Sequence, residues 1–168
     1  MPDRSGGAMS ESSNGSHDLD ATDRRLVGAL RAHPKGSISE LARRVEVSRG
    51  TVYSRLDRLE RTGVIAGYGP EIDSRAAGLG VLGFVTLEIE QGSHATTMAH
   101  LRAVPEILQV HTITGDGDLL CVVVASSNDH MHEVLQGITA HPAVARSRTQ
   151  LALHSETVRT VADVVAEA

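Results

Sequence analysis

The hydrophobic positions in the first third of the chain recur at the period of an α-helix. Leu26 and Leu30 lie one helical turn apart, downstream of Asp20, a residue type that caps helix N-termini. The same segment must end before Pro34, because a residue that precedes proline is pushed out of the helical conformation. These signals predict a first helix over residues 20–33.

Two further helices follow at short intervals. Ser37 and Glu40 have the spacing of a capping box, and the apolar positions that follow continue to Val45. A third helix is expected to begin after Ser48 and to continue to about Thr62. Three short helices with a tight turn between the second and the third describe a helix-turn-helix, whose third helix enters the major groove of DNA.

The third predicted helix has an apolar face and a polar face. Val52, Leu56 and Leu59 recur at spacings of four and three residues, so they share the buried face. The remaining positions and the cap carry hydroxyl, guanidinium and backbone donors that suit phosphates and base edges. The candidate DNA-binding residues are Ser48, Arg49, Gly50, Thr51, Tyr53, Ser54, Arg55 and Arg58.

The pattern changes after a glycine-rich hinge over residues 67–80, in which a short strand over 68–72 is expected. Strands and helices are then predicted in the order strand, helix, strand, strand, helix, strand, over residues 81–90, 96–103, 107–114, 119–125, 128–139 and 144–154. This order is the split βαβ, or ferredoxin-like, arrangement. Residues 157–167 predict a short amphipathic helix after the last strand.

Charge is distributed unevenly along the 168 residues. The net charge is −5, yet residues 21–66 carry ten basic and five acidic side chains, whereas residues 67–168 carry five basic and twelve acidic ones. This asymmetry indicates two modules with different partners, the basic one suited to a polyanion. The predicted division is a disordered tail (1–18), a helix-turn-helix domain (19–66), the hinge, and a ferredoxin-like domain (81–168).

Composition excludes several classes of protein. The single cysteine, Cys121, rules out a disulfide framework, and the nine histidines show no metal-ligand spacing, so neither a metal nor another cofactor is expected. No apolar run is long enough to cross a bilayer and no secretory signal is present, so no membrane partner is expected and the expected location is the cytoplasm, in association with the nucleoid. An aromatic content of 2% argues against a stacking platform for single-stranded nucleic acid. Met9 is an alternative start to Met1, and the sequence leaves this choice open.

Four segments carry recognisable motifs, which are LDATD (19–23), SISELARRV (37–45), SRGTVYSRLDRLERTGVI (48–65) and TGDGDLL (114–120). Together they resemble the Lrp/AsnC family of transcription regulators, over about residues 19–154. The resemblance implies an α+β fold, with an N-terminal helix-turn-helix of winged-helix type and a C-terminal ferredoxin-like βαββαβ domain that senses a ligand. It also implies homodimers that assemble into octamers, bind double-stranded DNA and respond to an amino acid or a related small metabolite bound between dimers.

The same resemblance assigns effector binding to the loop Thr114, Gly115, Asp116, Gly117 and Asp118. Turn amides suit an α-carboxylate, and carboxylates accept from an α-ammonium. The chain departs from the family pattern at Gly36, where an apolar residue is usual, at Glu46, where glycine is usual, and at Gly117, where an aromatic is usual. A glutamate at positive φ would be strained, and the missing aromatic would enlarge the pocket or leave it unused.

Other functions stay open on the sequence alone. An architectural DNA-binding protein of broad specificity would carry the same basic helix, and only its weaker preference for a cognate site would distinguish it. Sirohaem decarboxylases resemble the same two-domain family, but no catalytic constellation is evident, so an enzyme is not expected. Arg146 and Arg148 alternate on the last strand, where they either form a solvated edge or pair with acidic residues across a dimer interface.

Overall fold

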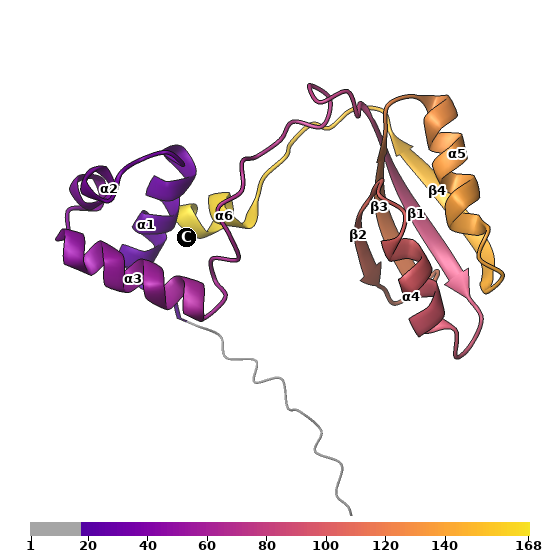
Figure 1. The fold of residues 1–168 in the computed structure, drawn as a ribbon, viewed down its shortest axis with the longest axis horizontal. Coiled ribbons are helices and arrows are strands. Elements are labelled where there is room, and N and C mark those ends of the chain that lie inside the picture. The colour runs from indigo at the N-terminus through magenta and orange to yellow at the C-terminus, as the bar shows by residue number, and fades with distance from the viewer. Residues whose placement is uncertain (1–17) are drawn as a thin grey trace, which may run out of the picture. The chain divides into compact units, whose positions relative to one another are not determined.

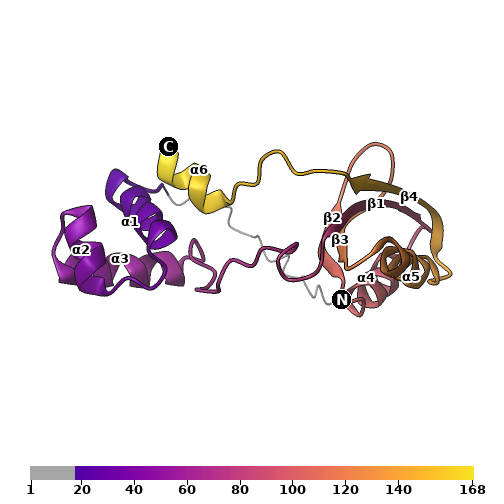
Figure 2. The ribbon, with the colours of Figure 1, turned by 90° about the horizontal axis from the view of Figure 1, so that it is seen from above.

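The computed structural model describes residues 18–168, which form two compact units (Figures 1 and 2). The first unit, in the part that the structure describes, consists of residues 18–70 together with Arg159–Ala168. The second unit is Glu71–Val158. The helix-turn-helix signals therefore lie in the first unit and the strand signals in the second.

The described residues of the first unit form four helices, which are α1 (Ala21–Ala32), α2 (Ile38–Val45), α3 (Arg49–Arg61) and α6 (Val161–Glu167). The first three pack around one apolar core, in which Leu26, Leu41, Val45, Val52 and Leu59 are each at most 1% exposed. Burying one such side chain contributes about 1.5–3 kcal/mol, so this core holds the three helices together. α6 packs against α1 and contributes no residue to the core.

The turn between α2 and α3 holds Glu46 in the left-handed conformation, with φ 59°. Among the described residues it is the one non-glycine residue with positive φ. The amide of Val47 donates to the carbonyl of Ala42 at 3.0 Å, which closes the turn. The positive φ that would strain a glutamate at this position is therefore present.

The second unit contains four strands and two helices, which are β1 (Val81–Ile89), α4 (His94–Arg102), β2 (Ile107–Thr112), β3 (Leu119–Ala125), α5 (Asn128–Thr139) and β4 (Val144–Ala152). The sheet order is β2-β3-β1-β4, and every neighbouring pair is antiparallel. The predicted α+β class and the βαββαβ order are confirmed.

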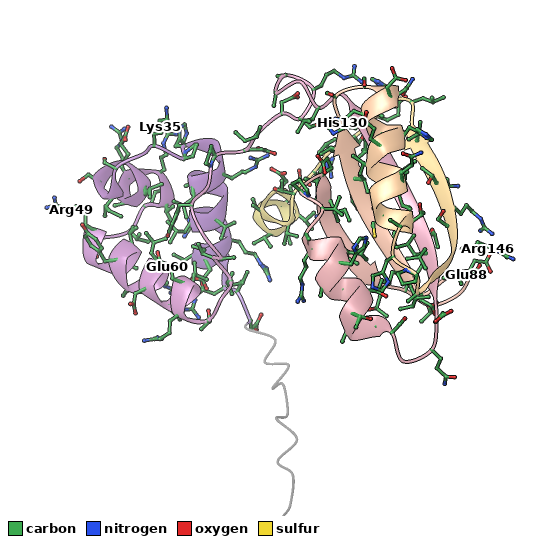
Figure 3. The ribbon with its side chains drawn as sticks, turned by 45° about the vertical axis from the view of Figure 1, so that its right-hand side comes forward. Lys35, Arg49, Glu60, Glu88, His130 and Arg146 are labelled. Atoms are coloured by element: carbon green, nitrogen blue, oxygen red, sulfur yellow. The ribbon has the colours of Figure 1, made fainter. Side chains whose placement is uncertain are left out.

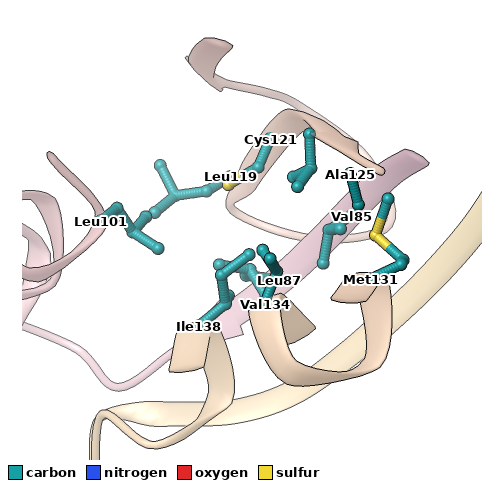
Figure 4. Close-up of a cluster of buried hydrophobic side chains, with 10 residues drawn as sticks. Val85, Leu87, Leu101, Leu119, Cys121, Ala125, Met131, Val134 and Ile138 are labelled. Carbon is teal, nitrogen blue, oxygen red and sulfur yellow. The ribbon is translucent and has the colours of Figure 1, made fainter. Parts of the chain in front are cut away.

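One face of this sheet is covered by α4 and α5, as the two views in Figures 1 and 2 show. Figure 4 shows the core between them, to which β1 contributes Val85 and Leu87, β3 contributes Cys121, and α5 contributes Met131 and Ile138. Successive side chains of a strand point to opposite faces, so the alternate positions of β1 form the other face. No helix covers that face within the part of this unit that the structure describes.

Several boundaries differ from the predicted ones. Residues 68–72 form no strand, because Gly67, Gly69 and Pro70 favour irregular backbone and no described strand pairs with them. β4 ends two residues earlier than predicted, β2 likewise, and β1 one residue earlier, whereas α4 begins two residues earlier.

The C-terminal residues differ most from the predicted domain division. Residues 159–168 belong to the first unit, and not to a domain that extends from 81 to 168. The predicted terminal helix begins only at Val161. The tail predicted to be disordered and the choice between Met1 and Met9 concern residues outside the described part, apart from Asp18.

Candidate nucleic-acid interface and ligand loop

The N-terminal turn of α3 is exposed and held in place by its cap. The Ser48 hydroxyl accepts a hydrogen bond from the Thr51 amide at 3.1 Å and lies 2.9 Å from the Thr51 hydroxyl. The Ser54 hydroxyl donates to the Thr51 carbonyl at 3.0 Å. The amides of Arg49 and Gly50 precede the first intrahelical hydrogen bond, so they remain able to donate to a phosphate oxygen.

The side chains around this turn point into solvent. Arg49 extends away from the helices, as does Lys35 (Figure 3), and the Tyr53 side chain is 63% exposed. Arg43 and Arg44 in the last turn of α2 are also exposed, and none of these four cations forms an ion pair with another described residue. Sequence reasoning missed Lys35, Arg43 and Arg44, although basic residues beside a recognition helix were a usable signal.

Arg55 and Arg58 are placed differently from the other predicted DNA contacts. Arg55 pairs with Asp20 and donates to Asp23 at 3.0 Å, and Arg58 pairs with the second oxygen of Asp23. Asp23 is fully buried. The two guanidinium groups therefore join α3 to the start of α1, and they are not presented as free phosphate ligands.

The same arrangement determines the charge state of both carboxylates. Burial alone would raise the pKa of Asp23, but hydrogen bonds from Arg58 and Arg55 outweigh it, and the net effect is a lowered pKa. The hydrogen bond from Arg55 is the largest influence that lowers the pKa of Asp20, to about 2. Asp20 and Asp23 also form a capping box at the start of α1, so one cluster caps α1 and fastens α3.

The predicted ligand loop joins β2 to β3 and is tied to β1 at one end. The Asp118 amide donates to the carbonyl of Leu87 at 2.9 Å, and the Asp118 carboxylate accepts from the amide of Ile89 at 2.8 Å. Asp116 is exposed and lies 3.8 Å from Arg148. Thr114 and Gly115 are exposed as well.

Gly117, which stands where the family usually has an aromatic residue, is closely packed. Its φ is 126°, and a Cβ atom placed on it would lie 2.4 Å from the Thr86 Cγ2 atom and 3.3 Å from the Leu87 carbonyl oxygen. No larger side chain fits that space unless the loop moves. The loop therefore lies directly against β1. The resemblance to the family did not predict this close packing.

A shallow hollow of about 250 Å³ lies beside this loop. It is lined by Ile89, Glu90, Gln91, Gly92, His94, Thr112, Ile113 and Asp118. Of the five predicted effector residues, only Asp118 contributes to it. Glu90 and His94 were not predicted, and they stand at the end of β1 and the start of α4 without a motif that marks them.

Arg146 and Arg148 face acidic residues of their own chain. Arg146 lies 3.7 Å from Glu88 across the β1–β4 pair, and Arg148 is the partner of Asp116. Over residues 18–168, no group of three metal-ligating side chains is close enough to hold a metal ion. No helix in that part of the chain is long and apolar enough to span a membrane.

Comparison with known proteins identifies both units. The AsnC-type helix-turn-helix domain matches residues 19–60, and the Lrp/AsnC ligand binding domain matches residues 82–162. The class of protein is thus a transcription regulator with a helix-turn-helix and a ligand-binding domain. More particularly, the chain belongs to the Lrp/AsnC family.

Relatives support this assignment over most of the chain. The transcriptional regulator AldR of Mycolicibacterium smegmatis is 30% identical over 138 residues, which are 80% of this chain and 81% of AldR. The regulator FL11 of Pyrococcus horikoshii is 26% identical over 141 residues, which are 83% of this chain and 93% of FL11. These relatives are named as transcription regulators and not as enzymes, so the sirohaem-decarboxylase alternative is set aside.

Solved structures share the fold. Escherichia coli AsnC superposes with a TM-score of 0.81 at 22% identity, covering 87% of this chain and 99% of AsnC. The Neisseria meningitidis regulator NMB0573, solved as a complex with L-Met, superposes with a TM-score of 0.78 at 25% identity, covering 86% of this chain and 96% of that one.

Proposed function

We propose that the chain is a sequence-specific DNA-binding regulator that responds to an amino acid or a related small metabolite. The observation that carries the DNA-binding part is the exposed first half of α3, with its free amides and its unpaired cation Arg49. Phosphates would be bound by Arg49, Arg43, Arg44 and Lys35, and base edges would be contacted by Thr51, Tyr53 and Ser54.

Arg55 and Arg58 have a supporting role in this proposal. Their guanidinium groups hold α3 against α1 through Asp23, so they determine where the exposed half of α3 lies. Because the charge of these arginines is largely neutralised by the carboxylate that they bind, they attract DNA phosphates only weakly. We therefore assign them to orientation of the recognition helix and not to direct readout.

Useful affinity for DNA requires two such units, and the uncovered sheet face offers a place for a second copy. Phe84, 36% exposed, lies on this face with its cross-strand partner Val122, and Leu120 lies opposite Thr86. Apolar residues at the centre of a sheet face, with charged residues at one end, suit a symmetric sheet-to-sheet contact. We propose a homodimer through this face, and assembly of dimers into an octamer as the family resemblance implies.

The ligand would bind at the hollow beside Asp118. Glu90 and Asp118 supply carboxylates for an ammonium group, and His94 adds a further polar contact. The α-ammonium group of an amino acid fits this chemistry, and the related regulator NMB0573 was solved with L-Met. One oxygen of the Asp118 carboxylate already accepts from the amide of Ile89, which leaves the second oxygen without a described hydrogen bond and able to accept from a ligand.

Fluorescence anisotropy tests the proposal, with DNA from upstream of the chain's own gene, random DNA, and two salt concentrations. Cognate DNA should bind at least about 10³-fold more tightly than random DNA, and both affinities should fall as salt rises. Arg49→Ala should weaken binding, whereas Arg102→Ala, an exposed arginine on α4, serves as the matched control. A smaller ratio would favour the architectural alternative, and no binding to either DNA would refute the proposal.

The effector part has its own test. Amino acids are added to the protein–DNA complex, and the change in affinity is compared between the unaltered chain and Asp116→Ala, whose side chain lies outside the hollow. Glu90→Gln should abolish the response to an amino acid that acts on the unaltered chain. A response that survives Glu90→Gln but is lost in Asp116→Ala would place the ligand elsewhere on the loop.

A further inference from the structure

α6 is attached to the first unit by contacts at the surface. No residue of α6 is fully buried, and none belongs to the core formed by α1, α2 and α3. A helix of seven residues is not stable alone in water, because the free-energy cost of nucleation exceeds the stabilisation from its few hydrogen bonds. α6 can therefore leave α1 without opening the core, and it unfolds when it leaves.

The surface of α1 beneath α6 is shaped for close contact. Gly28 lies in the middle of α1, where glycine costs about 0.5–1 kcal/mol relative to alanine. A Cβ atom at this position would lie 3.1 Å from the Cβ atom of Ala166, so a larger side chain would push α6 away. Gly28 thus lowers the intrinsic stability of α1 but allows α1 and α6 to pack closely.

An ion pair fixes the register of the two helices. Arg31 on α1 donates to the Asp163 carboxylate at 2.9 Å, and the same carboxylate accepts from the Thr160 amide at 2.7 Å. The Asp163 side chain therefore both caps α6 and binds it to α1. Formation of α6 and its docking are coupled through this one side chain.

Docking of α6 changes how the two units are connected. The chain passes from one unit to the other at Pro70–Glu71 and again at Val158–Arg159. The first passage is anchored to α3, because the Tyr68 hydroxyl donates to the Glu60 carboxylate at 2.5 Å. The second passage constrains the helix-turn-helix only while α6 stays on α1.

We propose that α6 is a releasable second tether that raises the affinity of a dimer for DNA carrying two half-sites. The inference rests on the proposed function, since it requires DNA binding by a dimer. Once one half-site is occupied, the second binds at an effective concentration set by the freedom of its connection. A helix-turn-helix held by two connections samples fewer positions than one held by a single connection, so its effective concentration at the second half-site is higher. Binding to a single half-site does not depend on this effective concentration.

Gly28→Gln tests the tether without weakening α1, because glutamine favours a helix more than glycine does. Its side chain occupies the place of Ala166, so α6 should be displaced. Affinity for a duplex with two half-sites should fall by about fivefold or more, and affinity for a duplex shortened to one half-site should stay unchanged. Gly137→Gln on α5, where an added Cβ atom meets no atom within 4 Å, is the matched control.

A disulfide between Gly28→Cys and Ala166→Cys provides the opposite perturbation. The helices need to separate by a few tenths of an ångström to reach a normal Cβ–Cβ distance of about 3.5–4.5 Å. Cys121 is buried and should not react. The oxidised protein should bind two half-sites at least as tightly as the unaltered chain, and each single-cysteine variant should not respond to oxidant.

Three results would overturn the tether. Equal loss of affinity for both duplexes in Gly28→Gln would mean that α6 acts on the helix-turn-helix itself. No loss for either duplex would mean that docking of α6 has no part in binding. Failure of the unaltered chain to bind either duplex would refute the proposed function, and the tether with it, so the two failures are distinguishable.

Discussion

Asp23→Asn would keep the size of a buried side chain and remove the charge that two arginines share. Asparagine would leave Arg55 and Arg58 without a negative partner at Asp23, and its amide group would face guanidinium donors. Loss of one partner from a buried ion pair costs about 3–5 kcal/mol. The arginine side chains are 27% and 39% exposed, so water would solvate them in part, and we expect a loss of about 2–3 kcal/mol.

Tyrosine fluorescence measures this loss in the first unit alone. The chain has no tryptophan, and its two tyrosines, Tyr53 and Tyr68, both lie in the first unit. Urea denaturation followed at this signal therefore reports the unfolding free energy of the helix-turn-helix. At about 0.05–0.15 kcal/mol per residue, a unit of this size has about 5 kcal/mol of stability, so the variant should lose a large share.

Asp57→Asn is the control, because Asp57 pairs with Arg61 on the exposed side of α3. An exposed pair one helical turn apart contributes at most about 0.5 kcal/mol. The reasoning is refuted if Asp23→Asn destabilises the unit no more than Asp57→Asn does. A double-mutant cycle between Asp23→Asn and Arg58→Ala should also show a coupling of about 1 kcal/mol or more.

Three further predictions follow from strained or charged positions. Glu46→Gly should stabilise the first unit by about 1 kcal/mol in the same urea assay, because glycine adopts positive φ freely, and unchanged stability would contradict the strain. Gly117→Ala should lower the thermal midpoint measured by circular dichroism, and adding Thr86→Ser, which removes the contacting methyl group, should recover part of the loss, whereas no recovery would place the strain elsewhere. The folded-state pKa of Asp20 is lowered to about 2, mainly by its hydrogen bond from Arg55, and the pKa of Asp23 is lowered as well. The stability that these carboxylates contribute should therefore be present above their unfolded-state pKa of about 4 and be lost as the pH falls through the folded-state pKa of Asp20. Tyrosine fluorescence should show acid unfolding in this window, and stability that is constant down to about pH 2 would contradict it.

The helices of the first unit were predictable because their signals are local. A capping box joins residues three positions apart, as at Ser37 and Glu40, and its geometry does not depend on the rest of the fold. The apolar stripe of α3 likewise needs only the helical period. The positive φ at Glu46 was anticipated only through the resemblance, because glycine is usual in the family at this position of the turn.

The site was only partly predictable because a residue's type does not identify its partner. The exposed half of α3 follows from helix periodicity, and the loop around Asp118 follows from a motif. Glu90 and His94 beside the hollow, however, are brought there by the end of β1 and the start of α4. No spacing along the chain marks such a pair.

The sequence by itself determined the three-helix order, the βαββαβ order and the basic and acidic character of the two modules. Each of these follows from short-range periodicity, capping and composition. Tertiary structure alone decided that Arg55 and Arg58 bind carboxylates on α1, more than 30 residues away in the chain, and that α6 returns to Gly28. The physical reason is that an arginine pairs equally well with phosphate or carboxylate, and only folding shows which anion lies within reach.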